Sequence, residues 1–490
     1  ADFDGNPRTR GVSFAKVGNE YHVTVGTDAL TDVGGNTTPL GSVKFEQGVG
    51  ATRHEISLAY TLPLNSMSAL YGKLANSDIR ITVNSYYHDG NIGGGIFKFD
   101  SSMDKSNHNG GTVISPSVPW SNDLHEYLSG NGESDASGAG CWVRVMEPDT
   151  NTLRPEYFGY DDTYLSGMLS VLKIIEVCKE ANGGTLLMPE KEFLLGGQMH
   201  YRSVGLDHDY VGSNFTWVIP TGGVVVLAGC FGLVWRPTGL GLDGGEKNFN
   251  MCGGGLLTGK SNLEADDCFL SLNFQHVIGV TVKDLTFKEV TSGHLLDLTG
   301  VADVIVKDCD FIGSCTEASN LKSRAGHEVI QIDSTVDTGR RYTVTEDNQY
   351  MDATVCSNLT FKNLRFMANR DTNGDIITHA QMSIGAHTWD MATIDKMLFD
   401  NIYVEQIHPD AIKAKGNDSA INIPACDNLV VKNIYFKTNG ARTEPAKDNG
   451  SNASIINTLW KGTYEHIDSP SSSSDVLPTY KTETRLPPKN

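Results

Sequence analysis

Apolar and polar residues alternate in a repeated way in five segments of the second half of the chain. In each segment positions one and three are apolar, position five is Asp or Asn, and positions six and eight are apolar again. A straight strand would send positions six and eight to the opposite face from positions one and three, so the chain must bend at position five. Asp and Asn tolerate the left-handed backbone that such a bend needs. The segments are 280–287, 304–311, 359–366, 397–404 and 429–436, with Asp284, Asp308, Asn363, Asn401 and Asn433 at the bends.

A second set of short alternating runs precedes these segments. The second and fourth residues of each run are apolar and are expected to point inward, whereas the third and fifth point outward. These runs are 269–273, 295–299, 329–333, 381–385 and 411–415. With the two halves of each bent segment they give three strands per turn, stacked at about 4.8 Å. The pattern predicts an all-β fold, a parallel β-helix that buries its core by stacking turn on turn.

Extra residues interrupt the repeat on both sides of the first strand of a turn. They fall at 313–327 and 367–379 before a first strand, and at 334–356 and 386–395 after one. Loops of this length are uncommon unless they are functional. We therefore expect the face of the first strands to form the binding groove, and we interpret Asp284 and Asp308 as corner residues without a catalytic role.

Composition excludes several classes of partner. The 490 residues carry a formal charge of −20, which argues against nucleic acid and anionic membranes as partners. No apolar run approaches the roughly 20 residues of a membrane helix, so no membrane insertion is predicted. The nine cysteines contain no C-x-x-C pair; Cys309 occupies an inward repeat position, and Cys356 and Cys426 share a position just before a strand that is apolar in the other turns. These three cysteines are predicted to be buried thiols that form neither disulfides nor zinc sites. For the protein as a whole no metal or cofactor is predicted to be required, although a bound divalent cation is left open.

The chain is predicted to have four parts. Short alternating runs in residues 1–85 indicate a small β-rich N-terminal domain for attachment or support. A connecting segment, 86–155, is followed by the β-helix at 156–440 and by a C-terminal extension or tail at 441–490. A helix is predicted over 162–181, with residues 165, 168, 169, 172 and 175 on one apolar face. We expect this helix to plug the open end of the coil.

Three strings in the connecting segment carry a resemblance to a known family. They are GGGIFKFD at 93–100, NGGTVI at 109–114 and CWVR at 141–144. This order resembles the stretch upstream of the β-helix in bacteriophage tailspike depolymerases, and YFG at 157–159 and NGGTLLMP at 182–189 resemble the entry to the β-helix in those proteins. The resemblance implies a right-handed, pectate-lyase-like β-helix in a homotrimer attached to phage tail or baseplate proteins. It also implies a virion tail protein, made in the host cytoplasm, that acts on a bacterial surface polysaccharide outside the cell.

Candidate catalytic residues lie on the face of the first strands. Asp297, Gln331 and Asp333 are expected side by side on an open shelf. Asp297 and Asp333, on adjacent turns and offset by two residues, would be about 7–8 Å apart. That separation falls within the window of roughly 6.5–9.5 Å of inverting glycosidases. If one of the two aspartates is not catalytic, Glu328 is the first candidate to replace it. An outward Asp on this fold is as often a solvated surface group as a catalytic residue.

Further polar and aromatic residues are predicted to bind substrate. Gln331, Ser383 and Lys413 share the third position of the first strand, and Lys415 takes the fifth. Asp410 lies at the start of a strand, and His387 and Trp389 lie in a loop beside the groove, where Trp389 could stack on a sugar ring. The predicted substrate-binding residues are thus Gln331, Ser383, His387, Trp389, Asp410, Lys413 and Lys415.

Three functions are compatible with this sequence. The first is hydrolysis of a bacterial capsule, exopolysaccharide or O-antigen, with inversion. The second is a polysaccharide lyase, in which Lys413, Lys415 or His387 removes a proton from a uronate. The third is a receptor-binding fibre without catalysis. An unsaturated product, detected by its ultraviolet absorbance, separates the second from the first, and the absence of any chain shortening would indicate the third.

Overall fold

The computed structural model divides into two compact units. Unit 1 comprises Ala1–His108, Val113–Trp120 and Gly130–Val145, and unit 2 comprises Asn109–Thr112, Ser121–Ser129 and Met146–Asn490. The structure describes residues 12–17, 20–25, 43–45, 54–56, 63–73, 75, 79–146, 151–196, 211–228, 230–235, 239–259, 269–290, 294–313, 328–334, 352, 354–378, 382–385, 394–405, 419–423, 426, 428–439, 444–448, 453–456 and 459–463.

Unit 1 is built from antiparallel strands. Its four-stranded sheet has the order β5-β6-β8-β7, and it extends across residue 85 because β5 pairs with β6. Two hairpins, β1–β2 and β3–β4, lie earlier in the chain. The strands are β1 (Val12–Val17), β2 (Glu20–Val25), β3 (Val43–Phe45), β4 (His54–Ile56), β5 (Arg80–Ser85), β6 (Gly93–Asp104), β7 (Val113–Ile114) and β8 (Ala139–Arg144), with short 3-10 helices at Met67–Leu70 and Lys105–Asn107.

The glycine-rich string and the Trp-x-Arg string form one structural unit within this sheet. The Arg144 guanidinium donates to the carbonyl oxygens of Gly94 and Gly93, at 2.6 and 2.9 Å. A Cβ on Gly95 would clash with Arg144 Nη1. Trp142 is buried and donates from Nε1 to the Lys73 carbonyl at 2.9 Å. Gly95 therefore leaves room for a buried arginine, whereas a Cβ on Gly94 would clash with the backbone carbonyl oxygens of Val83 and Asn84.

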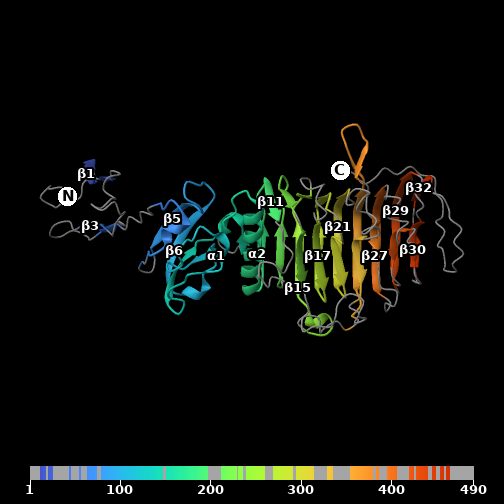
Figure 1. The fold of residues 1–490 in the computed structure, drawn as a ribbon, viewed down its shortest axis with the longest axis horizontal. Helices are drawn as coiled ribbons and strands as arrows, with labels where there is room; N and C mark the ends of the chain where they lie inside the picture. The colour runs from blue at the N-terminus through green and yellow to red at the C-terminus, as the bar shows by residue number, and fades with distance from the viewer. Residues whose placement is uncertain are drawn as a thin grey trace. The chain divides into compact units, whose positions relative to one another are not determined.

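Unit 2 contains a long stack of parallel strands, which Figure 1 shows from β11 to β32. Its helices are α1 (Leu124–Leu128) and α2 (Tyr164–Glu180), with 3-10 turns at Pro155–Phe158 and Leu242–Gly244. No helix of the described residues is long and apolar enough to cross a membrane. The first strands of unit 2 are β9 (Thr152–Leu153), β10 (Gly184–Leu187), β11 (Glu192–Gly196), β12 (Phe215–Val218), β13 (Val224–Ala228), β14 (Cys230–Trp235), β15 (Lys247–Cys252) and β16 (Leu256–Thr258).

The remaining strands continue the stack. Two of them, β24 and β25, form an antiparallel hairpin that leaves it. The strands are β17 (Phe269–Gln275), β18 (Ile278–Lys283), β19 (Thr286–Lys288), β20 (Leu296–Thr299), β21 (Ala302–Ile312), β22 (Glu328–Asp333), β23 (Ser357–Met367), β24 (Asn369–Arg370), β25 (Ile376–Thr378), β26 (Met382–Gly385), β27 (Asp395–Glu405), β28 (Ser419–Ile423), β29 (Leu429–Asn439), β30 (Glu444–Asp448), β31 (Ala453–Ile456) and β32 (Leu459–Thr463).

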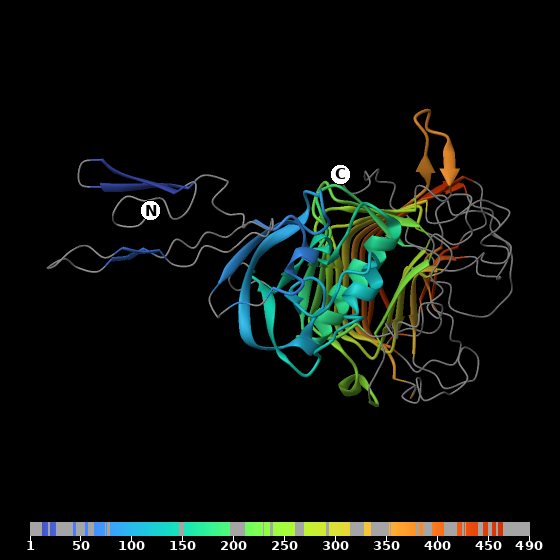
Figure 2. The ribbon, with the colours of Figure 1, turned by 60° about the vertical axis from the view of Figure 1, so that its left-hand side comes forward.

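Helix α2 closes one end of the stack. Its buried residues include Met168, Leu172 and Ile175, whereas Leu165, predicted on the same face, is 59% exposed. The helix packs on β10, β11 and β12, and Figure 2 shows it lying across the end of the coil. Asn182, just after the helix, has a φ of 53°, the left-handed conformation that ends many helices. The predicted plug is confirmed.

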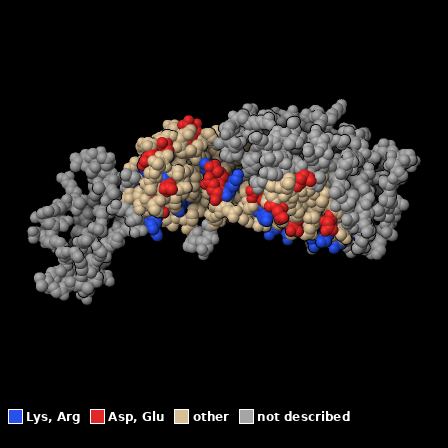
Figure 3. All heavy atoms as spheres, turned by 90° about the horizontal axis from the view of Figure 1, so that it is seen from below, with Lys and Arg blue, Asp and Glu red and all other residues tan. Residues whose placement is uncertain are grey.

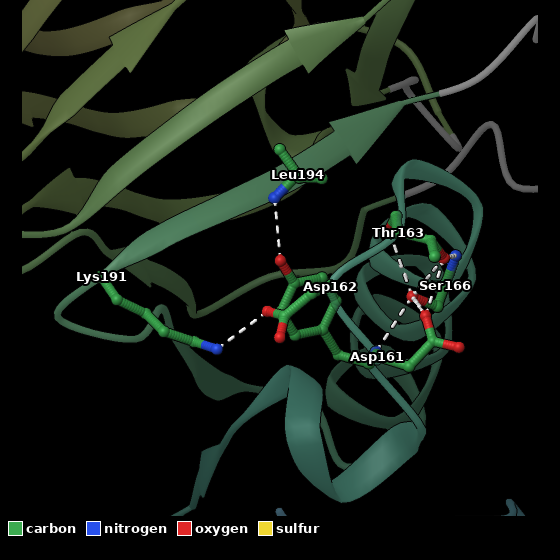
Figure 4. A network of polar contacts seen from close by, with 7 residues as sticks. Asp161, Asp162, Thr163, Ser166, Lys191 and Leu194 are labelled. Atoms are coloured by element: carbon green, nitrogen blue, oxygen red, sulfur yellow. Dashed lines mark hydrogen bonds and ion pairs between the residues drawn. The ribbon is translucent and has the colours of Figure 1, made fainter.

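Polar contacts fix the start of α2 to the first turn of the coil (Figure 4). Thr163 caps the helix by accepting from the Ser166 amide at 3.2 Å, and the Thr163 hydroxyl donates to Asp161 at 2.7 Å. Asp162 forms an ion pair with Lys191 at 2.8 Å. The Tyr160 hydroxyl accepts from the backbone amide of the β11 residue Leu194 at 3.0 Å, and burial raises the pKa of this tyrosine.

The five repeat segments stack in the predicted register. Val280 pairs with Val304, Val304 with Leu359, Leu359 with Met397, and Met397 with Leu429. All five bend residues have φ between 53° and 61°, as the left-handed bend requires. Together with the first strands, the two halves of each bent segment make three strands per turn. The fold is the predicted parallel β-helix.

Aromatic residues stack inside the coil from turn to turn. The rings of Phe287 and Phe311 are 5.3 Å apart and nearly parallel, and those of Phe311 and Phe366 are 4.8 Å apart. Phe361 and Phe399 repeat the arrangement at 5.2 Å. Cys309, Cys356 and Cys426 are buried free thiols, as predicted. One continuous apolar core therefore runs from α2 through the stacked turns.

The first strands form a separate seven-stranded sheet, in the order β14-β17-β20-β22-β26-β28-β30. The pairing of β20 with β22 has the predicted register, with Leu296 opposite Ile330. Two other pairings differ by two residues, because Leu272 lies opposite Leu296 and Ile330 lies opposite Ile384. A shift of two residues keeps every side chain on its own face, so alternation alone does not exclude it.

The fifth predicted first strand, 411–415, is not tested by the described residues. The strand that pairs with β26 is β28, through Ile384 and Ile421, and 411–415 lies outside the described residues. Stacking also continues past residue 440, where the repeat was expected to fade. β30 pairs with β28, and β31 and β32 pair with β29, which carries the stack to Thr463.

The described surface of the coil carries acidic and basic side chains beside one another (Figure 3).

The bend residues supply the first prediction. Asn363, at φ 53°, donates to Asp308 Oδ1 at 2.6 Å and accepts from Asn401 Nδ2 at 2.9 Å. Alanine removes both bonds and disfavours the left-handed backbone, so Asn363→Ala should lower the free energy of unfolding by about 1–3 kcal/mol. Asn363→Gly, which keeps the backbone relaxed, should lose less. Denaturant unfolding measures both, and equal stability of wild type and the alanine variant would contradict the role of the bend.

Candidate functional site

Two rows of side chains run along the outer face of the first strands. Residues of a row lie directly opposite one another in neighbouring turns. The first row is Asn273, Asp297, Gln331 and Gly385, and the second is Gln275, Thr299 and Asp333. Asp297 and Asp333 therefore lie on adjacent turns, offset by two residues, as predicted.

Hydrogen bonds orient both aspartates. Asn273 Nδ2 donates to Asp297 Oδ2 at 3.0 Å, and Thr299 Oγ1 donates to Asp297 Oδ1 at 3.0 Å. Gln331 Nε2 donates to Asp333 Oδ2. Donors on both oxygens of Asp297 suit an ionised carboxylate, because hydrogen bonds to the charged form favour it. Gln331 lies between the two carboxylates, opposite Asp297 and bonded to Asp333.

The shelf that carries these groups is covered. Asp297 is 7% exposed, Asp333 2%, and Gln331 and Glu328 are both fully buried. We expected an open shelf, and this expectation was wrong. Alternation fixes the direction of a side chain but not what lies over the face to which it points. The site is a buried polar layer on the outside of the coil.

Glu328, at the start of β22, contacts the turns on either side of it. His294 Nδ1 lies 2.8 Å from the Glu328 carbonyl oxygen and 3.8 Å from the carboxylate Oε2. A carbonyl oxygen only accepts, so Nδ1 of His294 carries the hydrogen. On the other side, a Cβ built on Gly385 would clash with Glu328 Cγ and would lie 2.8 Å from Oε1. Neither His294 nor Gly385 was among the predicted site residues.

Other predicted substrate-binding residues are placed only in part. Ser383 lies in β26, two residues before Gly385, so Gly385 and not Ser383 shares the row of Gln331. The remaining candidates lie outside the described residues, and their roles stay predictions. They are His387, Trp389, Asp410, Lys413 and Lys415.

Cys356 lies beneath the two aspartates. Its thiol donates to the Asp333 carbonyl oxygen at 3.2 Å. Burial raises the pKa of the Cys356 thiol to about 12, and the nearby Asp333 and Asp297 carboxylates add to the rise. A thiol with such a pKa is not a nucleophile at neutral pH. Cys356 is part of the support of the site.

A pair formed by the buried His276 and the exposed Asp352 adjoins the rows at the end of β17. His276 Nε2 lies 3.1 Å from Asp352 Oδ1, and the amide of Gly241 donates to Asp352 Oδ2 at 2.6 Å. Burial acts to raise the pKa of Asp352, but hydrogen bonds from the Thr354 hydroxyl, the Gly241 amide and the Thr354 amide, together with His276, lower it to about 2. Burial lowers the pKa of His276. The pair joins three segments that are far apart in sequence.

The described residues contain no cluster of three or more His, Cys, Asp or Glu side chains arranged to hold a metal ion. The carboxylates of the two rows are separated by amide and hydroxyl side chains, which suit hydrogen bonding to a polar ligand. The expectation that no cofactor is required stays a prediction.

Comparison with known proteins supports the resemblance to tailspikes. Residues 63–147 match the family model of the phage tail protein small four-stranded β-sheet domain, which covers the β5-β6-β8-β7 sheet of unit 1. No curated protein matches the sequence. The match concerns the sheet of unit 1, which is similar to a domain of phage tail proteins.

Solved structures with a similar fold include three proteins. PfbA, a surface adhesin of Streptococcus pneumoniae, is 14% identical, with 65% of this chain and 68% of that chain covered and a TM-score of 0.42. WceF of Pantoea stewartii, a glycan biofilm modifying enzyme with a tailspike-like parallel β-helix, is 12% identical, with 85% and 50% covered and a TM-score of 0.41. The capsular polysaccharide depolymerase gp49 of Acinetobacter baumannii bacteriophage Fri1 is 11% identical, with 85% and 77% covered and a TM-score of 0.28.

The His276–Asp352 pair supplies a prediction about acid stability. A carboxyl whose pKa is lowered from 3.8 to about 2 on folding stabilises the protein above pH 3.8, and this stability is lost as pH falls towards 2. Asp352→Asn should therefore be less stable than wild type at pH 5, and the difference should shrink between pH 4 and 2. Thermal unfolding across this range measures it. The exposed Asp375→Asn serves as control, and a difference that does not change with pH would contradict the prediction.

Proposed function

We propose that this chain is a phage tailspike that binds a bacterial surface polysaccharide and cleaves it by hydrolysis with inversion. In this proposal it acts as a homotrimer attached to phage tail or baseplate proteins, outside the host cell. Two findings support the setting: the match of residues 63–147 to a phage tail domain and the parallel β-helix of unit 2.

The observation that carries the proposal is the arrangement of Asp297, Gln331 and Asp333. The backbone positions of Asp297 and Asp333, on adjacent turns and offset by two residues, are about 7–8 Å apart. Inverting glycosidases keep their carboxyl groups roughly 6.5–9.5 Å apart, which leaves room for a water molecule between the base and the sugar. A retaining mechanism needs about 5–5.5 Å, which a diagonal pair does not offer.

The hydrogen bonds assign a role to each aspartate. Asp297 accepts from Asn273 and Thr299 and is suited to remain ionised, so it acts as the base that takes a proton from water. Asp333 acts as the acid that protonates the leaving oxygen. Gln331, bonded to Asp333 and opposite Asp297, holds the space between them.

Substitution of Asp333 tests the proposal. Asp333→Asn keeps the shape and the bond with Gln331 but removes the acid, so cleavage should fall by about 10²–10⁴-fold while thermal unfolding stays unchanged. The substrates are purified surface polysaccharides of candidate host strains, and the readouts are new reducing ends and the anomeric configuration of the first product. The exposed Asp243→Asn is the matched control and should keep full activity.

Each alternative gives a distinct result in the same assay. Retained activity of Asp333→Asn would remove the pair. A product with ultraviolet absorbance from a new double bond would indicate elimination. Binding without any shortening of the polysaccharide by the wild type would indicate a receptor-binding fibre.

A further inference from the structure

The carboxyl of Glu328 occupies the place that a side chain of residue 385 would take. Gly385 belongs to the same row as Asp297 and Gln331. A Cβ on it would point outward with that row, where it would clash with Glu328 Cγ and lie 2.8 Å from Oε1. Such close contacts are not tolerated, so any side chain at 385 would displace Glu328. Because Gly385 lacks one, Glu328 leans across the row and fills its fourth place.

His294 fixes the same residue from the preceding turn. Its Nδ1 donates to the Glu328 carbonyl oxygen at 2.8 Å, which anchors the backbone at the start of β22. The same nitrogen is 3.8 Å from Glu328 Oε2, too far for a hydrogen bond but close enough for a charge interaction when the imidazole is protonated. The His294 side chain is 12% exposed and that of Glu328 is fully buried.

The row thus carries two carboxyl groups on either side of Gln331. Asp297 is one turn before Gln331, and the Glu328 carboxyl lies at the place of Gly385, one turn after it. Two turns at about 4.8 Å put these places roughly 9.6 Å apart, close to the upper end of the inverting window. The Glu328 carboxyl is therefore a third acidic group in the site, beside the two aspartates that carry the acid and base steps.

We propose that Gly385 and His294 are positioning residues that hold the Glu328 carboxyl in the row of Asp297 and Gln331, where it stabilises the positive charge that develops on the sugar in the transition state. The inference rests on the proposed glycan hydrolysis. It adds to that proposal two residues that touch no substrate and act only through Glu328.

A double-mutant cycle on the full chain tests the role of Gly385. The φ of Gly385 lies outside the left-handed region, so alanine there brings no backbone strain, and the three nearest atoms to its Cβ all belong to Glu328. Glu328→Gln and Gly385→Ala should each lower kcat about 10²-fold with KM within about twofold. The double variant should be no slower than the slower single variant, because both changes remove the same group. Glu328→Ala/Gly385→Ala, in which the crowding atoms are gone, should be as stable as Glu328→Ala.

Two substitutions separate the functions of His294. The Asn side-chain amide can take the place of Nδ1 as a donor but never carries charge, whereas Leu provides neither. His294→Leu should lower kcat about as much as Glu328→Gln, and His294→Asn should restore most of it. In the presence of Glu328→Gln, neither change should have a further effect. His88, exposed in unit 1, provides the control His88→Leu.

The outcomes distinguish this inference from the proposed function. Suppose that wild type cleaves polysaccharide. If Gly385→Ala then keeps full kcat, or if the double variant loses kcat by the product of the two single losses, the positioning role is wrong and the hydrolase proposal stands. If wild type cleaves no polysaccharide, the proposed function itself fails. A third outcome would also overturn the inference. Gly385→Ala would lose activity and unfold at a lower temperature, and adding Glu328→Ala would not restore the unfolding temperature. That result would indicate a general structural defect.

Discussion

The left-handed backbone at one Asp or Asn in each turn is the constraint on which the coil depends. It turns the strand by the angle that lets residues on both sides of it point into the core. Because every turn bends at the same place, the amide and carboxylate groups of the bends bond from turn to turn, as Asn363 does with Asp308 and Asn401. The bends keep successive turns in register, and without that register the rows of polar side chains on the first strands would not exist.

The same bend explains which parts of the structure were predictable. The bent segments were aligned residue for residue, because a bend residue marks one position and a shift of two would move it onto an apolar site. The first strands carry only alternation, which repeats every two residues. Their register was correct where Asp297 meets Gln331 and differed by two where Leu272 meets Leu296 and Ile330 meets Ile384.

The candidate site shows a similar division. Residue types and spacing placed Asp297, Gln331 and Asp333 together, because neighbouring turns bring them together in any coil of this kind. Their burial was not predictable, since it depends on what covers the face. Gly385 offered no chemical signal, as its contribution is the space it leaves for Glu328. The contact of His276 with Asp352 joins residues 76 positions apart, and neither residue belongs to a repeat (352 − 276).

Helix α2 gives the coil a fixed origin. A stack in which each turn touches only its neighbours has two ends that would expose apolar residues, and α2 covers one of them with Met168, Leu172 and Ile175. Length can therefore change by whole turns elsewhere in the coil without altering the capped end. A coil built in this way is able to lengthen its polar rows one turn at a time while the capped end stays the same.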